Sequence, residues 1–254
     1  MTSNTVNTSK KYEMTDEVHP EHANLRRIRA LRDIPVIDVK QGDLGGWVEC
    51  SENLSQDGDC WISDDAIVAD DACVSDNAQI RNKAEVYDEG RVSGDACLCN
   101  DAQLFGSAHM TNKARAYDDT IIYGDARLYD EVRVYGSAQI LGEAQLLDRV
   151  RVFGSALVAG GAQLYDDVQI FGNTQIFGEA VLHDRVHVYD CARVFGRTRL
   201  SDDVHVYDNA TVSGDIWLSG ALRIKGNLRV NKEVSNTGTV HMTSEPYLKK
   251  GEVQ

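Results

Sequence analysis

Two histidines, His187 and His205, are the residues of this chain whose type and spacing best suit acid–base chemistry. They lie eighteen residues apart, and Arg151 and Arg223 fall in the same eighteen-residue series. A neutral imidazole accepts a proton near pH 7 and a nearby guanidinium attracts an anion, so this set suits a general base beside an anionic ligand. A histidine on an open surface is more often simply solvated, and the sequence leaves both interpretations open.

The eighteen-residue spacing is built from a shorter repeat of six residues. In the stretch Arg133 to Ala156, RVYGSAQILGEAQLLDRVRVFGSA, an aliphatic residue returns every six positions, and a small or β-branched residue follows four places later. Two places after each aliphatic residue comes glycine, aspartate or asparagine. These residues adopt a left-handed backbone conformation most readily, so each unit predicts one short strand and one tight turn.

A longer period lies above the six-residue unit. The repeat runs from Ile62 to Val230 without insertion, and every third turn tends to carry the same residue type. Glycine forms one such column and aspartate another, at Asp130, Asp148, Asp166, Asp184 and Asp202. Three strands and three turns thus make one coil, and coils stack at the strand spacing of about 4.8 Å. The predicted fold is all-β, a triangular parallel β-helix of about ten 18-residue coils with an N-terminal cap.

The sequence outside the regular repeat predicts how the β-helix begins and ends. A cap is expected because the open end of a solenoid exposes unpaired strand edges. Leu44 starts the aliphatic series, which lapses at Cys50 and Gln56 before it becomes regular. The expected segments are a disordered tail over 1–24, an N-terminal cap strand over 25–43, the hexapeptide-repeat β-helix over 44–230, and a C-terminal cap and tail over 231–254.

Composition limits the classes of function. The formal net charge of −14 argues against a general binder of nucleic acids or anionic membranes, because the field of the protein repels phosphate. The chain has no run of about 18 apolar residues, and its N-terminus lacks the apolar region of a secretion signal. The six cysteines show no paired metal-ligand spacing, so we expect a cytoplasmic protein with reduced thiols and no metal site.

Sorting the outward residues by the eighteen-residue period separates three faces. The first, called the basic–aromatic face, contains Arg115, Tyr117, Arg133, Tyr135, Arg151, Phe153, Phe171, Tyr189, Tyr207 and Arg223. Aromatic rings beside guanidinium groups suit sugars, nucleotides or a single strand of nucleic acid. Cross-strand ladders also stabilise sheets by themselves, so the same residues suit a structural role or a contact between protomers.

A second face is more apolar and is predicted to mediate self-association. Its residues are Phe105, Ile121, Tyr123, Leu141, Leu157, Phe177 and Phe195. A soluble monomer seldom leaves such a strip open, so we expect a homo-oligomer. The third face is mixed, and its corner carries the aspartate column, which suits either turns or bound calcium. The turn interpretation is preferred because no known calcium-loop spacing is present.

The unit [LIV]-x-[GDN]-x-[AVT]-x, as in VYGSAQ, ILGEAQ and VFGSAL, resembles the hexapeptide repeat of left-handed β-helix proteins. The likeness covers residues 44 to about 230, and it implies the left-handed sense of the coil. The entry motifs GDLGGW and NLSQDGDCW resemble the start of YdcK-type proteins, an acetyltransferase-like family without an established substrate. This chain departs from the hexapeptide pattern by often placing tyrosine or phenylalanine directly after the aliphatic residue.

The resemblance implies an acyltransferase. Hexapeptide proteins often transfer an acyl group from acetyl-CoA or another acyl-CoA at a site between the subunits of a trimer, with a histidine as general base. In this sequence that histidine would be His187 or His205. A loop that breaks the helix near the site is common in the family, and no such loop interrupts residues 62–230.

The interpretation carried forward is a non-catalytic, oligomeric β-helix scaffold or binding protein that uses the basic–aromatic face, with a protein or a carbohydrate as partner. A CoA-dependent acyltransferase of the hexapeptide-repeat type is the alternative. A second alternative is a decoy, because a long acidic rod can mimic a nucleic-acid duplex. Arginine and lysine residues interrupt the negative charge that such a mimic requires.

Overall fold

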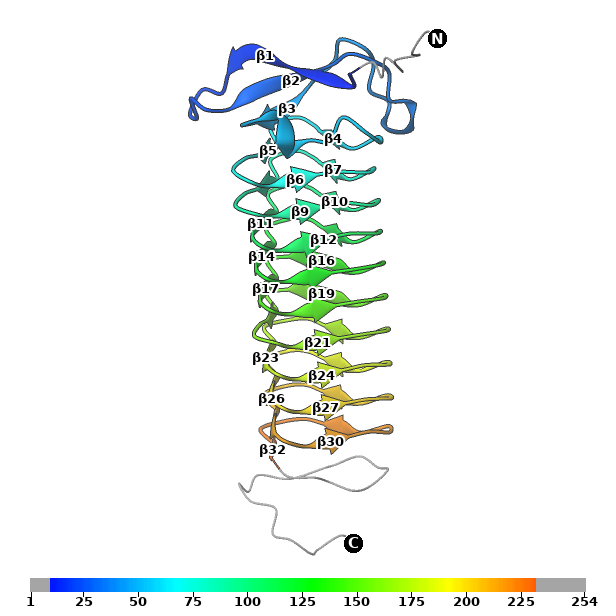
Figure 1. The fold of residues 1–254 in the computed structure, drawn as a ribbon. Helices are drawn as coiled ribbons and strands as arrows, with labels where there is room; N and C mark the ends of the chain where they lie inside the picture. The colour runs from blue at the N-terminus through cyan, green and yellow to red at the C-terminus, as the bar shows by residue number, and fades with distance from the viewer. Residues whose placement is uncertain (1–9, 232–254) are drawn as a thin grey trace, which may run out of the picture. The chain divides into compact units, whose positions relative to one another are not determined.

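The computed structural model describes residues 10–231, and these residues form a β-solenoid (Figure 1). Three parallel sheets make triangular coils, which number about ten at a spacing of about 18 residues, and an antiparallel cap precedes them. The predicted fold class is therefore confirmed. Contacts divide the chain into two compact units, residues 1–124 and residues 125–254, which are described in turn.

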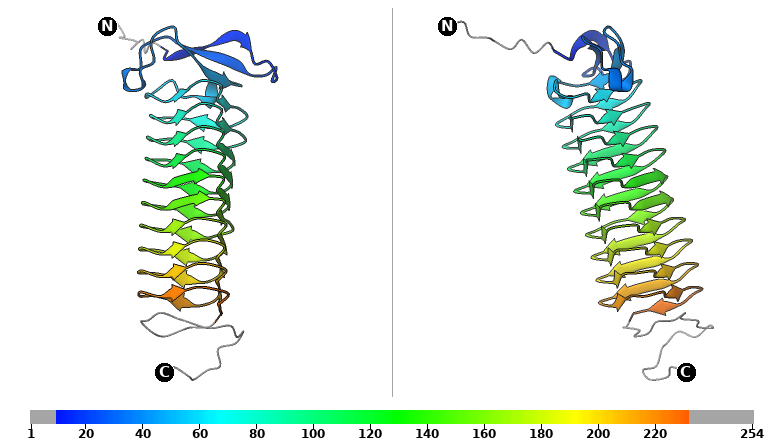
Figure 2. Two further views of the ribbon diagram at one scale, coloured as in Figure 1. Left: turned by 180° about the vertical axis from the view of Figure 1, so that it is seen from behind. Right: turned by 90° about the vertical axis from the view of Figure 1, so that its right-hand side faces the viewer.

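The first unit begins with an antiparallel cap of β1 (Tyr12–Val18), β2 (Arg26–Ala30) and β3 (Leu44–Val48). Figure 2 shows these strands in blue beside the first coils. A short 3-10 helix, η1 (Pro35–Ile37), lies between β2 and β3. The strand expected within residues 25–43 is β2, which pairs with β1 on one side and with β3 on the other.

The disordered tail expected over residues 1–24 is wrong for β1. Tyr12 is 1% exposed, and its phenol O–H is shared between the carbonyl oxygens of Ser51 and Leu54, at 3.0 and 2.8 Å. β1 also pairs with β2, with Tyr12 opposite Ala30. The polar composition of the segment indicated disorder, but one buried tyrosine and the backbone pairing hold it to the first coil.

At the start of the repeat, the buried aliphatic series begins at a different residue from the one expected. Leu44, expected to start the buried aliphatic series, is 51% exposed, whereas Val48 and Leu54 are fully buried. A Cβ on Gly46 would lie 2.5 Å from the carbonyl oxygen of Ala66, so glycine lets β3 lie close to the next coil.

The first coil is two residues longer than the coils that follow. Val48 pairs with Val68, twenty residues later, whereas Ile62 pairs with Ile80, eighteen residues later. The additional residues fall in the segment 55–60, which follows η2 (Ser51–Asn53) and the buried Leu54. Gln56 of this longer segment accepts hydrogen bonds from the backbone amides of Lys11 and Tyr12, at the start of β1.

The coils of the first unit contribute short strands to each of the three sheets. Sheet 1 contains β3, β5 (Ile67–Val68), β8 (Glu85–Val86), β11 (Gln103–Gly106) and β14 (Ile121–Gly124). Sheet 2 contains β4 (Trp61–Ile62), β7 (Gln79–Ile80), β10 (Cys97–Leu98) and β13 (Arg115–Ala116). Sheet 3 contains β6 (Cys73–Val74), β9 (Arg91–Val92) and β12 (His109–Met110).

The second unit repeats the same arrangement. Sheet 1 contains β17 (Gln139–Gly142), β20 (Leu157–Val158), β23 (Gln175–Gly178), β26 (Arg193–Gly196), β29 (Thr211–Gly214) and β32 (Arg229–Val230). Sheet 2 contains β16 (Arg133–Gly136), β19 (Arg151–Gly154), β22 (Gln169–Ile170), β25 (His187–Val188), β28 (His205–Val206) and β31 (Arg223–Ile224). Sheet 3 contains β15 (Arg127–Leu128), β18 (Gln145–Leu146), β21 (Gln163–Leu164), β24 (Val181–Leu182), β27 (Arg199–Leu200) and β30 (Trp217–Leu218).

The core of the second unit is a stack of equivalent positions. The aliphatic residue of each strand pairs with its counterpart one coil away, as Val134 does with Val152, and both are fully buried. The small residue of the unit, such as Ala138 or Ala156, is fully buried as well. Burying one valine stabilises the fold by about 1.5–3 kcal/mol, so the repeated pattern supplies the driving force of each coil.

The geometry of the turns explains the aspartate column. Asp148, Asp166 and Asp184 have φ angles of 62°, 58° and 62°, in the left-handed region. The carboxylate of each accepts a hydrogen bond from the backbone amide eighteen residues later, at 3.1–3.3 Å. Each aspartate therefore forms its own turn and caps the amide of the next, which accounts for the column without a bound cation.

Part of the predicted organisation lies outside the described residues. This holds for residues 1–9 of the expected N-terminal tail and for residues 232–254 of the expected C-terminal cap and tail. Within residues 10–231, no helix has the length and apolar character needed to cross a membrane.

Candidate functional site

Sheet 2 carries the basic–aromatic face in the second unit. Each strand places one outward residue before its buried aliphatic residue and one after it. Pairing puts Arg133 beside Arg151, and His205 between His187 and Arg223. The aromatic column of the same sheet contains Tyr135, Phe153, Phe171, Tyr189 and Tyr207. The predicted residues Arg115 and Tyr117 hold the corresponding positions at β13 in the first unit.

The five rings of the second unit form one continuous stack. Successive ring centroids are 4.8, 4.9, 5.0 and 4.9 Å apart, and neighbouring ring planes differ by at most 5°. Every ring is half-buried. Each inner ring is covered on both faces by its neighbours, so the ring edges face solvent. Such pairs contribute about 0.5–1.5 kcal/mol beyond burial, so the column also stabilises the sheet.

The two histidines of the basic column lie against each other, with ring centroids 4.5 Å apart. The Nδ1 atom of His187 is 3.0 Å from the carbonyl oxygen of Arg185, which can only accept. Nδ1 therefore carries the proton of the neutral ring, and Nε2 is its basic atom. The Nε2 atom of His205 is 3.5 Å from Asp203, whose other carboxylate oxygen accepts from Arg223 at 2.8 Å.

These contacts set the protonation states of the site. Desolvation lowers the pKa of His205, the positive charge of Arg223 and that of His187 in its protonated form lower it further, and Asp203 opposes them. The hydrogen bond from Arg223 is the main cause of the lowered pKa of Asp203. At pH 7 His205 is therefore neutral and Asp203 ionised, which is the state that a general base on His205 requires.

A concave surface among residues 10–231 lies away from the two histidines. A hollow of about 310 Å³ on sheet 3 of the first unit is lined by Cys73, Ser75, Asp76, Arg91, Ser93, His109, Met110 and Thr111. His187 and His205 do not line it; they lie on the outer face of sheet 2. Small-molecule sites enclose most of their ligand, so the two histidines need a further surface to form a cofactor site.

Within the described part of the chain, two groups of side chains have the spacing of metal ligands. The ligand atoms of His187, Asp203 and His205 lie within 4.8 Å of one another. The same holds for Asp166, His183 and Asp184. Imidazole and carboxylate suit zinc and related ions, but the guanidinium of Arg223 already holds the Asp203 carboxylate and repels a cation.

Neither group was predicted from the sequence, because Asp166 and Asp184 were interpreted only as turn residues and Asp203 lies outside the aspartate column. A signal was present: Asp184 and Asp203 each lie within two residues of a histidine, and the eighteen-residue period brings the other ligand next to them. The absence of a metal site stays a prediction.

The predicted self-association face lies on sheet 1. In the first unit, the rings of Phe105 and Tyr123 pack with centroids 4.6 Å apart, and Tyr123 is 47% exposed. In the second unit, Phe177 and Phe195 stack at 4.7 Å. The remaining members, Ile121, Leu141 and Leu157, are half-buried.

Polar residues share this face with the apolar ones. The column that precedes the buried aliphatic residues contains Gln139, Leu157, Gln175 and Arg193. The column that follows them contains Leu141, Phe177 and Phe195. Sheet 1 thus presents one apolar column beside one mixed column, and self-association stays a prediction.

Comparison with known proteins adds no family. No protein-family model and no curated protein matches the chain. The described residues form a parallel β-solenoid of about ten turns with coils of about 18 residues.

Proposed function

We propose that this protein is a non-catalytic, oligomeric scaffold that binds a macromolecular partner through the basic–aromatic face. The observation that carries the proposal is the five-ring stack from Tyr135 to Tyr207, in which the rings cover one another's faces. The basic column beside the stack contributes Arg133, Arg151 and Arg223.

The stacking geometry favours a broad partner over a small stacking ligand. A sugar or a nucleobase binds an aromatic side chain across the face of the ring. In this stack the faces of Phe153, Phe171 and Tyr189 are covered on both sides. The accessible ring edges and guanidinium groups instead suit another protein surface, where aromatic residues and arginine are enriched. A protein partner is therefore preferred over a carbohydrate.

The distribution of charge indicates an acidic partner. The chain as a whole carries a formal net charge of −14, yet Arg133 and Arg151 are exposed side by side on this face. Complementary charge steers association and orients the partner, while like charge elsewhere on the surface disfavours other orientations. The basic column would thus select the face to which an acidic protein binds.

The acyltransferase alternative is supported by the neutral His205 and by the resemblance to hexapeptide-repeat proteins, which also implies the left-handed sense of the coil. Acetyl-CoA or another acyl-CoA would lie near Arg223, with His187 or His205 as the base. This function requires a neighbouring subunit to close a groove over sheet 2, because the two histidines lie on an outer sheet face.

The acidic-decoy alternative is supported by the aspartate column, which presents a carboxylate at every coil from Asp148 to Asp202. Arg149 interrupts this charge, since its guanidinium donates two hydrogen bonds of 2.6 Å to Asp167. The mixture of signs favours the scaffold over the decoy.

Binding to an acidic polypeptide tests the proposed partner surface. We would compare the affinity of polyglutamate, at low ionic strength, for the wild-type protein and for the double variant Arg133→Ser/Arg151→Ser. The matched control is Arg127→Ser/Arg199→Ser, because both arginines are exposed on sheet 3 of the same unit. Affinity should fall only in the first variant, and an equal fall in both would reduce the binding to net charge and contradict the proposal.

The oligomeric part of the proposal is tested by light scattering on the full chain. The wild-type protein should be a multimer, and Phe177→Ser/Phe195→Ser should dissociate it, because these stacked rings lie on the apolar column of sheet 1. A wild-type monomer at micromolar concentration would contradict the oligomer while leaving the partner surface to the polyglutamate experiment.

A further inference from the structure

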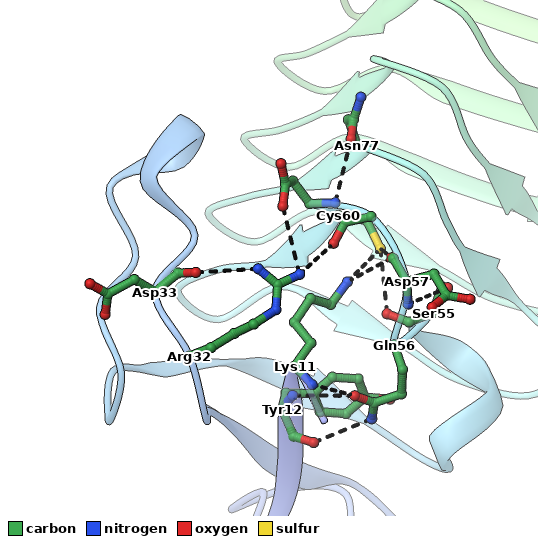
Figure 3. A network of polar contacts seen from close by, with 11 residues as sticks. Lys11, Tyr12, Arg32, Asp33, Ser55, Gln56, Asp57, Cys60 and Asn77 are labelled. Carbon is green, nitrogen blue, oxygen red and sulfur yellow. Dashed lines mark hydrogen bonds and ion pairs between the residues drawn. The ribbon is translucent and has the colours of Figure 1, made fainter. Parts of the chain in front are cut away.

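A buried lysine and a buried cysteine face each other where the cap meets the first coil. Lys11 and Cys60 are both 0% exposed, and the Nζ atom of Lys11 lies 3.0 Å from the Sγ atom of Cys60 (Figure 3). The amine also donates to the backbone carbonyl oxygen of Asp57 at 3.2 Å. The two residues are 49 positions apart in sequence, so the contact joins the start of the cap to the solenoid.

The site exists because the first coil is two residues longer than the others. The side-chain oxygen of Gln56, in the longer segment, accepts from the backbone amides of Lys11 and Tyr12 at 2.8 and 3.3 Å. The amide nitrogen of Gln56 donates to the carbonyl oxygen of Tyr12 at 3.2 Å. These three hydrogen bonds fix the backbone of Lys11 and direct its side chain toward Cys60, as Figure 3 shows.

The Lys11 side chain has no carboxylate partner among the described residues. Its hydrogen-bond partners are the thiol of Cys60 and a backbone carbonyl, although a buried ammonium normally pairs with an acid. Amine and thiol can exchange one proton across this contact, giving either a neutral pair or an ammonium–thiolate pair. Burial raises the pKa of the Cys60 thiol and Lys11 opposes that shift.

The surroundings of the sulfur favour reaction with the amine over other outcomes. The carbonyl oxygens of Ser55, Asp57 and Val74 lie 3.6–3.7 Å from Sγ, so the thiol is enclosed by backbone. The other described cysteines are half-buried or exposed, so Cys60 is the cysteine best shielded from bulky thiols. If a small oxidant reaches Cys60, the nearest nucleophile to the oxidised sulfur is therefore the amine of Lys11.

We propose that Lys11 and Cys60 form a covalent N–O–S bridge under oxidation by peroxide. In the first step the thiol is oxidised to a sulfenic acid, an S–O bond forms, and the peroxide is reduced to water. In the second step a further peroxide takes one hydrogen from the sulfenic acid and one from the amine, is reduced to two waters, and the N–O bond forms. The nitrogen and the sulfur thus each lose two electrons, and the product carries one oxygen between them.

The bridge would turn a hydrogen-bonded cap into a covalently closed one. It would link β1 to the first coil across the same 49-residue separation, and a cross-link of this kind restricts the unfolded chain as a disulfide does. Unlike a disulfide it needs a single cysteine, and a thiol reductant would reverse it. The protein would therefore hold its cap more firmly under oxidising conditions.

Peptide mass mapping of the intact protein after treatment with hydrogen peroxide tests this inference. The expected product is a cross-linked pair of peptides containing Lys11 and Cys60, heavier than their sum by one oxygen and lighter by two hydrogens. Dithiothreitol should restore the separate peptides, and the temperature of unfolding should be higher before reduction than after it. The cross-link should be absent in Lys11→Arg and Cys60→Ser and present in Cys191→Ser, the matched control with an exposed cysteine removed.

Three results would overturn the inference, and all are read from the wild-type protein, so they do not depend on the variants folding. One is a cross-link without oxygen, which would be a direct S–N bond. Another is Cys60 oxidised to sulfinic acid with Lys11 unmodified. The third is unreacted Cys60 at a peroxide concentration that oxidises Cys191.

Discussion

In the second unit, core residues such as Val134 and Val152 lie on one another at a constant spacing of eighteen residues. In the first coil, the paired residues Val48 and Val68 are twenty residues apart. The regular coils are stabilised by repeated contacts, because each buried residue packs against the equivalent residue of the next coil. The first coil breaks the repetition, and single polar side chains hold it in place.

Asn53 illustrates how the irregular coil is stabilised. This fully buried side chain accepts from the backbone amides of Glu49 and Cys50 at 3.0 and 2.8 Å. It also donates to the carbonyl oxygens of Asp70 and Ala72, both at 2.9 Å. One amide side chain thus bonds to four backbone groups of the irregular coil, one of which, the Glu49 amide, also donates to the carbonyl oxygen of Val68 at 3.3 Å. Tyr12 and Gln56 act in the same way where the cap joins this coil.

The largest loss of stability is expected from a core residue of the regular coils. Ile170 is fully buried, and Ile170→Ala should lower the free energy of unfolding by about 2–5 kcal/mol, because it removes apolar contacts and leaves a cavity. Urea denaturation followed by circular dichroism measures this. The control is Gln169→Ala on the same strand, and a comparable loss there would contradict packing as the source of stability.

A smaller loss, confined to the irregular coil, is expected from Asn53→Ala. Removing the side chain leaves the Cys50 amide and the carbonyl oxygens of Asp70 and Ala72 to find water, which should cost about 2 kcal/mol. Hydrogen exchange should show faster exchange at the amide of Cys50, whereas the amide of Glu49 keeps its hydrogen bond to the carbonyl oxygen of Val68. Asn209→Ala, at an exposed turn, should leave stability nearly unchanged; if the two variants behaved alike, the special role of Asn53 would be refuted.

At one turn of the regular coils, two substitutions of the same glycine should lower the free energy of unfolding by different amounts. Gly154 has a φ of 74°, and a Cβ there would lie 3.0 Å from the amide nitrogen of Gly172, so Gly154→Ala should cost about 1–2 kcal/mol. Gly154→Asp should cost less, because its carboxylate can accept from that amide, as Asp148 does from Asp166. Thermal unfolding of the three proteins checks the order, and equal losses would show that the aspartate cap contributes nothing.

The smallest effect is expected from pH. The pKa of His205 is lower in the folded protein than its unfolded value of about 6.5, so the unfolded chain binds more protons in this range. Stability should therefore rise as pH increases through this window and fall as pH decreases through it. The slope of unfolding temperature against pH between about 5 and 7 should be shallower in His205→Gln than in the wild type. Identical slopes would show that His205 does not titrate as described.

The sequence was sufficient to predict the regular coils, because a six-residue pattern repeated without insertion leaves one way to bury the aliphatic residues. It was also sufficient to place Arg133, Tyr135 and their counterparts on one face, since the eighteen-residue period fixes which residues stack. The sequence did not predict the exposure of Leu44 or the strand β1, because no repeat there determines which residues are buried. There the fold depends on single contacts made by Tyr12 and Asn53, which no periodic pattern reveals.

The sequence predicted which residues lie together in the candidate site, but it did not predict their side-chain contacts. The period brought His187 next to His205, but the contacts of Asp203 with His205 and Arg223 depend on side-chain conformation at a turn. The parallel stacking of the five rings, which favours a protein partner over a stacking ligand, likewise depends on geometry that residue types alone do not fix.

The most direct test of the proposed function is isothermal titration calorimetry with acetyl-CoA and with CoA, on protein whose mass in solution has been determined by light scattering. A non-catalytic scaffold predicts no binding of either compound, in the wild type and in His187→Ala or His205→Ala alike. Micromolar binding of acetyl-CoA to a trimer, lost in either histidine variant, would contradict the scaffold and establish the acyl-CoA site on sheet 2.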